Sequence, residues 1–258
     1  MAAAAALAPT MAVAASSSPG RETIAVTDHA IKLPHSGLHS GINSIRILPS
    51  GHQVHHLVFW RLEAGVGYAR FDAVLRSNTG NPEQLSSIEG GNGPVPPGTT
   101  LDLYLVLPAG HYAITDLVHD NVSTEIHTTV AKARTQQAPP RSIGTVDARR
   151  GVDRYRLSPG FGQPGVYKFR NLDPDTHEVA VVRLAPGKTV RDLINWAKHP
   201  AGPPPATPVG GFGALHGHGH GWFVLPRLPH GHYAFACFIS NAMGVSHLAM
   251  GMAAGFTR

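Results

Sequence analysis

Short apolar runs recur along the chain from about residue 21 onward, and turn-forming residues separate them. Residues 165–170 (GVYKFR) alternate apolar and polar side chains, whereas residues 179–184 and 233–239 are almost continuously apolar. Alternation with a period of two is typical of a half-buried strand, and a short continuous run is typical of a buried one. Scattered Gly and Pro favour many short strands over long helices. The pattern therefore predicts an all-β chain.

One segment departs from this pattern. In residues 188–199, Val190, Leu193, Ile194 and Ala197 fall at helical spacing on one face, with Asp192 near the start. Spacings of three and four residues indicate an amphipathic helix. Residues 68–76 occupy the corresponding place earlier in the chain. We therefore expect a β-sandwich in each half of the chain, interrupted by one short helical excursion.

Three landmarks occur twice, in the same order and at nearly the same offset. Residues 55–65 (HHLVFWRLEAG) match 177–187 (HEVAVVRLAPG) at an offset of 122 residues. Glycine-rich residues 90–93 match 210–213, and residues 107–113 (LPAGHYA) match 228–234 (LPHGHYA). Repetition of this kind indicates duplication of a domain of roughly 110 residues, which is an ordinary domain size.

The duplication sets the expected domain boundaries. Residues 135–142 are polar and Pro-rich, so we expect a linker between one domain at 21–134 and a second at 143–258. Residues 1–20 begin with an Ala-rich apolar run and end in SSSPG. They resemble a secretory signal peptide, although no basic residue precedes the apolar run; a disordered Ala-rich tail is the alternative. With a signal peptide, the protein would be exported to a periplasmic, cell-surface or extracellular location. No other stretch reaches the ~20 apolar residues that a membrane span needs.

Composition narrows the classes of function. The 258 residues carry a formal net charge of +5 and only 14% charged residues, with no run of Lys and Arg, so nucleic acid is not an expected partner. A single cysteine excludes an intramolecular disulfide framework. The 17 histidines indicate metal binding instead.

The cysteine is the most informative of the candidate ligands. Cys237 follows a strand-like segment, His177 stands some sixty residues upstream, and His247 and Met252 follow downstream. One thiolate, two imidazoles and a thioether form the ligand set of a mononuclear blue-copper site. Met250 is a second candidate for the thioether ligand. The alternative is that the cysteine and methionines are buried core residues, as most are.

These segments resemble the cupredoxin family of blue copper proteins. The resemblance rests on residues 166–171 followed by His177, on residues 229–237 (PHGHYAFAC), and on His247 with Met252. It covers all of the second copy and, more weakly, the first. It implies two tandem Greek-key β-sandwich domains, and one copper ion in the C-terminal domain that exchanges electrons with a redox partner protein. Nine residues separate Cys237 from His247, where the family has only a few.

The first copy lacks the cysteine. Asp116 stands in its place, His55 matches His177, and His127 falls within one residue of the position of His247. Two imidazoles and a carboxylate would form a harder site for zinc or non-blue copper. Further histidines occur nearby at His52, His56 and His119. The alternative is a degenerate copy that serves folding or dimerisation.

A separate His-rich segment suggests other functions. His216, His218 and His220 alternate with glycines, and short His tracts of this kind capture copper or zinc. Copper buffering or delivery without electron transfer is therefore an alternative function, and a metal-free interaction module is another. Oxidase chemistry is not expected, because Ala236 and Phe238 flank Cys237 and no His-x-His motif lies on a predicted strand. We therefore expect no enzymatic activity.

Overall fold

The computed structural model describes residues 20–258 apart from 78–79, 129–136, 150 and 152–153. The expected signal peptide at 1–20 lies almost wholly outside the described residues, as does the start of the expected linker. The first half of the chain contains strands β1 (Glu22–Thr27), β2 (Ala30–Lys32), β3 (Gly41–Pro49), β4 (Leu57–Leu62), β5 (Ser86–Gly91), β6 (Leu101–Leu107), β7 (Gly110–Asp116) and β8 (His119–Thr128). Helix α1 (Tyr68–Ser77) and the 3-10 turn η1 (Pro82–Gln84) lie between β4 and β5.

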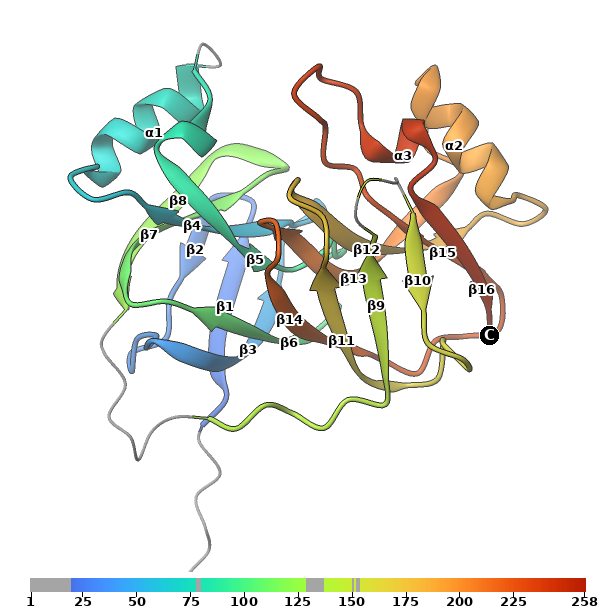
Figure 1. Ribbon diagram of the computed structural model, residues 1–258, viewed down its shortest axis with the longest axis horizontal. Helices are drawn as coiled ribbons and strands as arrows, with labels where there is room; N and C mark the ends of the chain where they lie inside the picture. The colour runs from blue at the N-terminus through green and yellow to red at the C-terminus, as the bar shows by residue number, and fades with distance from the viewer. Residues whose placement is uncertain (1–19, 78–79, 129–136, 150, 152–153) are drawn as a thin grey trace, which may run out of the picture.

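The second half has the same kinds of element. Its strands are β9 (Gly144–Ala148), β10 (Tyr155–Leu157), β11 (Gly165–Asn171), β12 (His177–Leu184), β13 (Ala206–Leu215), β14 (His220–Leu225), β15 (His232–Ala236) and β16 (Ala253–Thr257). Helix α2 (Val190–Lys198) follows β12, and the one-turn helix α3 (His247–Met250) precedes β16. The two halves lie side by side in Figure 1, with the N-terminal half on the left.

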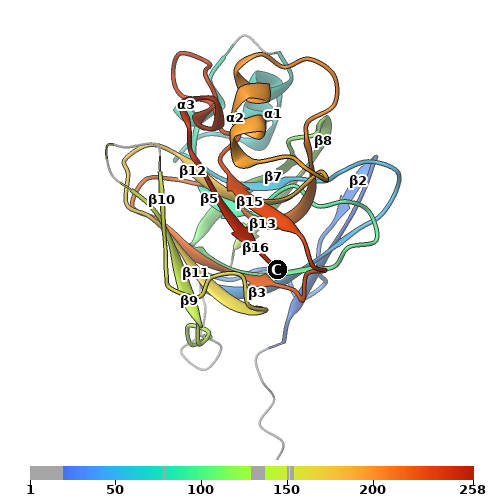
Figure 2. The same cartoon turned by 90° about the vertical axis from the view of Figure 1, so that its right-hand side faces the viewer.

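The strands form two eight-stranded sheets. One has the order β10-β9-β11-β14-β6-β3-β1-β2 and the other the order β16-β15-β12-β13-β5-β4-β7-β8. Figure 2 shows them as two stacked layers. Both sheets continue from one half into the other, through β14 beside β6 and β13 beside β5. The predicted fold class, an all-β protein of β-sandwich halves with short helical excursions, is confirmed.

Each half contributes four strands to each sheet, and the order in one half mirrors the order in the other. In both halves the first strand pairs in parallel with the third, β1 with β3 and β9 with β11. This correspondence agrees with the spacing of the sequence landmarks, but the origin of the halves by duplication stays a prediction. The shared sheets were not expected, because the sequence suggested two domains joined only by a linker.

Apolar side chains from both sheets meet in one core. Along β6 the leucines are buried, whereas Asp102, Tyr104 and Val106 are only partly so, as expected for a strand with one face inward. Burial of each leucine stabilises the fold by about 1.5–3 kcal/mol relative to exposure. Strand β12 is buried along almost its whole length, because Leu193 of α2 packs against Val182 and Leu184 on its outer face.

Helix α2 lies within the predicted segment 188–199, and a side-chain cap fixes its start. The Thr189 side chain accepts the Asp192 amide N–H, while the Asp192 carboxylate accepts the Thr189 amide N–H, which forms a capping box. Phe71 anchors α1 by its burial. Helix α3 was not expected; the glycine after it, Gly251, takes a left-handed conformation (φ 110°) and ends it after a single turn.

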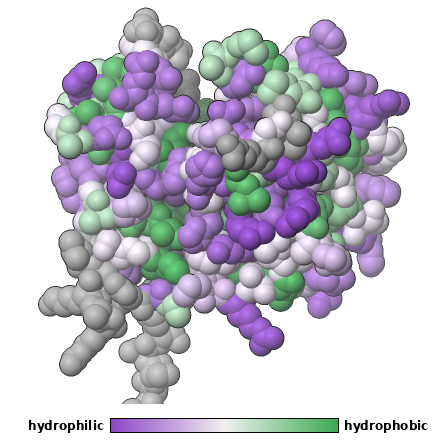
Figure 3. Space-filling view, in the orientation of Figure 1, coloured by the Kyte–Doolittle hydropathy of each residue, from purple (hydrophilic) through white to green (hydrophobic). Residues whose placement is uncertain are grey.

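The face shown in Figure 3 is mostly hydrophilic, with apolar residues scattered over it rather than gathered in one area. Among the described residues, no helix is both long enough and apolar enough to cross a membrane.

Candidate metal centre

Three of the predicted ligands meet at one edge of the second sheet. His177 is the first residue of β12, Cys237 directly follows β15, and His247 is the first residue of α3. Strands β12 and β15 are antiparallel neighbours, with Ala180 opposite Ala236. The start of β12 and the end of β15 therefore lie at the same edge, which brings the first histidine close to the cysteine.

The three side chains form a compact buried cluster. His177 Nδ1 lies 3.1 Å from His247 Nδ1, and Cys237 Sγ lies 3.7 Å from the first nitrogen and 3.4 Å from the second. The exposed fractions of the three residues are 2%, 0% and 2% in chain order. Three ligands in a plane around a metal ion, at bonds of about 2.0–2.3 Å, are separated by roughly 3.5–3.8 Å. The observed separations between the ligand atoms are therefore close to those expected around one metal ion.

The long segment between Cys237 and His247 folds back on itself. The Asn241 side-chain oxygen accepts the amide N–H groups of Met243 and Val245, which closes a tight turn. The His247 amide then donates to the Ile239 carbonyl at 2.9 Å. Ser246 caps α3 by accepting the Ala249 amide N–H. The extra residues therefore form a hydrogen-bonded hairpin that returns the second histidine to the cysteine.

The structure separates the two candidate methionines. Met252 is fully buried in the same core cluster as Cys237. Its amide donates to the His247 carbonyl at 2.8 Å, and its carbonyl accepts the Cys237 amide N–H at 3.2 Å. Met250 is 39% exposed, and its sulfur accepts a hydrogen bond from the Asn241 amide group. Of the two, Met252 is therefore the one that is buried and bonded through its backbone to members of the cluster.

The thiol lies in an environment that opposes its ionisation. Burial, together with the nearby Glu178 carboxylate, raises the pKa of Cys237 well above its usual range. Glu178 is itself fully buried, and one of its carboxylate oxygens accepts the Phe238 amide N–H at 2.7 Å. A thiolate here needs a cation to stabilise it, so metal binding would release the thiol proton.

Groups behind the ligands restrain His177. The Asp173 carboxylate lies 3.9 Å from His177 Nε2, on the side of the ring away from Cys237. The Asn171 amide group holds the loop before His177 by donating to the carbonyl oxygens of Asp175 and Leu215. Carboxylates and carbonyls behind a histidine commonly orient metal-binding rings.

The first half does not assemble the expected His55–Asp116–His127 set. His55 Nδ1 lies 2.7 Å from the Asp116 carboxylate, but His127 stacks on His111 at the opposite end of β7, with ring centroids 4.0 Å apart. The turn between β7 and β8 is short, so His119 rather than His127 begins the returning strand and approaches His55. Alignment by sequence offset matched His127 to His247 and gave His119 only as a nearby histidine, because the long loop of the second half has no counterpart here.

The three histidines of the Gly-rich segment do not converge on one point. His216 Nε2 lies 3.2 Å from the Glu89 carboxylate of the other half, and that contact raises the pKa of His216. His218 is exposed in a left-handed turn conformation, and the His220 ring packs edge-on to Trp222. Among the described residues, the clusters that could hold a metal ion include none of the three.

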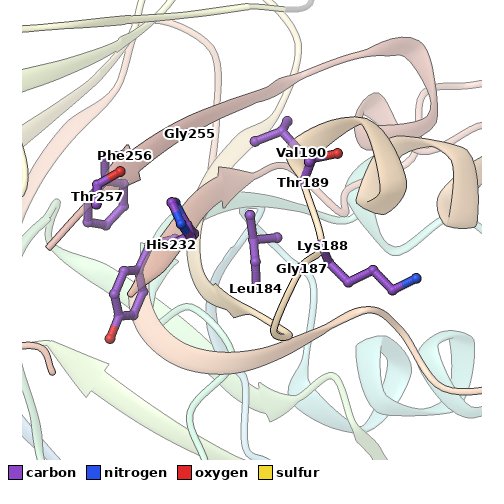
Figure 4. Close-up of a pocket in the computed structure, with 10 residues that line it drawn as sticks. Leu184, Gly187, Lys188, Thr189, Val190, His232, Gly255, Phe256 and Thr257 are labelled. Atoms are coloured by element: carbon purple, nitrogen blue, oxygen red, sulfur yellow. The ribbon is translucent and has the colours of Figure 1, made fainter. Parts of the chain in front are cut away.

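Several hollows flank the second half, and two of them bear on the position of the cluster. One, of about 430 Å³, is lined by His247, by loop residues around Asn241 and Asp175, and by Asn81 and Glu83 from the first half. His247 is the one of the three cluster residues that lines it. The other, of about 400 Å³, lies where His232 pairs with Thr257 at the opposite end of β15 from Cys237 (Figure 4). This second hollow is therefore not part of the candidate metal centre.

No protein-family model and no curated protein matches the chain. Among solved structures, auracyanin from the photosynthetic bacterium Roseiflexus castenholzii is similar over 43% of this chain and 95% of its own, with 18% identity and a TM-score of 0.29. McoA multicopper oxidase from Aquifex aeolicus is similar over 91% of this chain, with 13% identity and a TM-score of 0.26. A laccase from Botrytis aclada is similar over 95%, with 12% identity and a TM-score of 0.23. The chain spans 65% and 56% of these two oxidases. Function is therefore argued from the site residues.

Proposed function

We propose that the protein binds one copper ion in its C-terminal half and carries electrons. The observation that supports this most strongly is the buried contact among Cys237 Sγ, His177 Nδ1 and His247 Nδ1. A thiolate with two imidazoles favours copper in a trigonal site, with a long thioether contact from Met252 to tune the potential.

The types of the three ligands and the elements that hold them support copper over other metal ions. Soft thiolate and borderline imidazole ligands suit both oxidation states of copper. All three ligands are attached to strands or to the hydrogen-bonded hairpin, so the chain resists rearrangement when the charge of the centre changes. Copper bound here would supply one-electron redox chemistry.

Electron exchange needs a surface that a partner can reach. The hollow lined by His247 supports such a route, because His247 is the one of the three cluster residues that lines it. Glu83 and Asp175 in its lining favour a redox partner protein with a basic contact surface. We also propose export to a periplasmic, cell-surface or extracellular location, on the signal-like pattern of residues 1–20.

A copper titration of the purified protein tests the proposal. Visible absorption and electron paramagnetic resonance would follow Cu²⁺ addition to the wild type and to Cys237→Ser, with His218→Gln as a matched control in the Gly-rich segment. We expect an intense thiolate-to-copper band that saturates at one equivalent, persists in the control and disappears in Cys237→Ser. Copper binding that gives no such band and is unchanged in Cys237→Ser would refute the proposal.

A further inference from the structure

We propose a second metal site in the N-terminal half, formed by Asp28, His55 and His119 and suited to Zn²⁺. One ligand atom from each residue lies within 4.8 Å of the others. Asp28 lies in the turn between β1 and β2, His55 precedes β4, and His119 begins β8. Three separate parts of the chain thus converge on one point.

The two ring nitrogens of His55 have different neighbours. Its Nδ1 donates to the Asp116 carboxylate at 2.7 Å, because a carboxylate can only accept. Its Nε2 lies 2.9 Å from the Ser50 carbonyl oxygen and 3.6 Å from an Asp28 carboxylate oxygen. Since both of these neighbours are acceptors, Nε2 either donates a proton to the Ser50 carbonyl or, in place of that proton, binds a positive ion that both oxygens also face. A carboxylate behind a histidine whose other nitrogen faces the metal is the usual arrangement of a metal-bound imidazole.

Asp116 acts here as a positioning residue and not as a ligand. Its second carboxylate oxygen accepts the amide N–H groups of His56 and Val118, at 3.0 and 3.1 Å. Both oxygens are therefore engaged, and the residue is almost completely buried. The aspartate that replaces the cysteine in this half thus fixes the ring of His55.

The His119 ring supplies an independent observation. Its Nε2 is buried and has no hydrogen-bond partner among the described residues. The ring lies next to that of His55, with centroids 5.3 Å apart. A buried polar nitrogen without a partner carries an uncompensated desolvation penalty. Coordination to a metal ion would remove that penalty.

The third ligand is held in place by backbone hydrogen bonds. The Asp28 oxygens accept the amide N–H groups of His52 and Gln53. Gly51 permits the close approach, because a Cβ atom there would lie 2.4 Å from an Asp28 oxygen. The turn before β4 therefore wraps the carboxylate and directs it toward His55.

The ligand types point to Zn²⁺. Two imidazoles and one carboxylate, without sulfur, form a common three-residue zinc set that leaves one position open for water. The C-terminal cluster differs in having a thiolate. The two sites can therefore be distinguished by their spectra, and this inference does not depend on copper binding at the other site.

Metal titration of the full chain tests this site. Zn²⁺ binding would be measured by calorimetry in Cys237→Ser, which removes the thiolate of the other site, and again after adding His119→Ala or Asp28→Asn. His127→Ala serves as the matched control, and circular dichroism verifies folding. We expect one Zn²⁺ equivalent at the N-terminal site, lost in both ligand variants and retained in the control. An Asp116→Asn variant should weaken that binding by about 10–100-fold.

Cobalt substitution provides a second readout. Co²⁺ at the proposed site should give weak visible bands without sulfur-to-metal charge transfer, and His119→Ala should abolish them. Zn²⁺ uptake that is absent, or that is unchanged in both Asp28→Asn and His119→Ala, would overturn the inference.

Discussion

Cys237 has polar partners that a cysteine in an apolar core lacks. Two imidazole nitrogens lie within hydrogen-bonding reach of its sulfur, although the residue itself is fully buried. Burial raises the pKa of the thiol, so the proton would leave only in exchange for a cation. The same burial would shield a bound copper ion from water and hold its ligands in place.

The two methionines allow a test at the scale of single residues. We predict that Met252→Leu shifts the reduction potential and the thiolate-to-copper band, because Met252 is buried and is hydrogen-bonded through its backbone to both Cys237 and His247. Met250→Leu should change neither, since its side chain is partly exposed and bonded to Asn241. Each swap nearly conserves volume and should cost less than about 1.5 kcal/mol of stability. Voltammetry and absorption of the copper-loaded variants would measure both effects. Equal shifts in the two variants would argue against Met252 as the axial ligand.

At the scale of elements, periodicity predicted the regular segments well. Alternating residues 165–170 lie within β11, and the helical spacing of residues 188–199 corresponds to α2. The sequence also indicated His177, Cys237 and His247 as candidate ligands, because their types and order resemble a blue-copper ligand set, and the structure brings the three together. Periodicity of a single segment is local, so it could reveal neither the sharing of sheets between halves nor helix α3.

The proposed Asp28 site could be predicted only in part: the sequence indicated His55 as a ligand and His119 as a nearby histidine, but no spacing or motif indicated Asp28. Asp28 and His55 come together only through the turns beside β1 and β4, and His119 only through the short turn after β7. The offset of the repeat suggested His127 instead. Insertion of a loop in one copy changes which residues face each other, and a comparison of sequence positions does not reveal that change.

At the scale of the whole molecule, polar contacts join the two halves where they meet. Glu178 of the second half lies 3.2 Å from the His56 ring of the first, and both residues are buried. Glu89 of the first half contacts His216 of the second, and Arg61 lies 3.3 Å from the same carboxylate. Together with the continuous sheets, these contacts join the halves as one folded unit.

The Glu89–His216 contact makes stability depend on pH. Burial alone would raise the pKa of Glu89, but hydrogen bonds from His216 and Ser87 outweigh it and lower that pKa below 4.5. The same contact raises the pKa of His216 above 6.5. The contribution of His216 to the stability of the folded protein is therefore complete below pH 6.5, and it is lost as pH rises through the raised pKa. The glutamate contribution is present above pH 4.5 and is lost as pH falls through the lowered pKa.

We therefore predict that His216→Gln destabilises the protein near pH 5.5, by about 1 kcal/mol or less because the ring is partly exposed. The destabilisation should be much smaller at pH 9, where His216 is neutral. Urea unfolding at both pH values would measure it, with the exposed His218→Gln as control. An equal loss of stability at both pH values would show that the charge interaction between Glu89 and His216 does not stabilise the protein.

X-ray absorption at the copper edge would show whether one copper ion binds Cys237, His177 and His247. For protein loaded with one equivalent, we expect one sulfur neighbour and two nitrogen neighbours, at roughly 2.3 and 2.0 Å. His247→Ala should lose one of the nitrogens while the sulfur remains. A shell of nitrogen and oxygen alone in the wild type would show that copper does not bind Cys237.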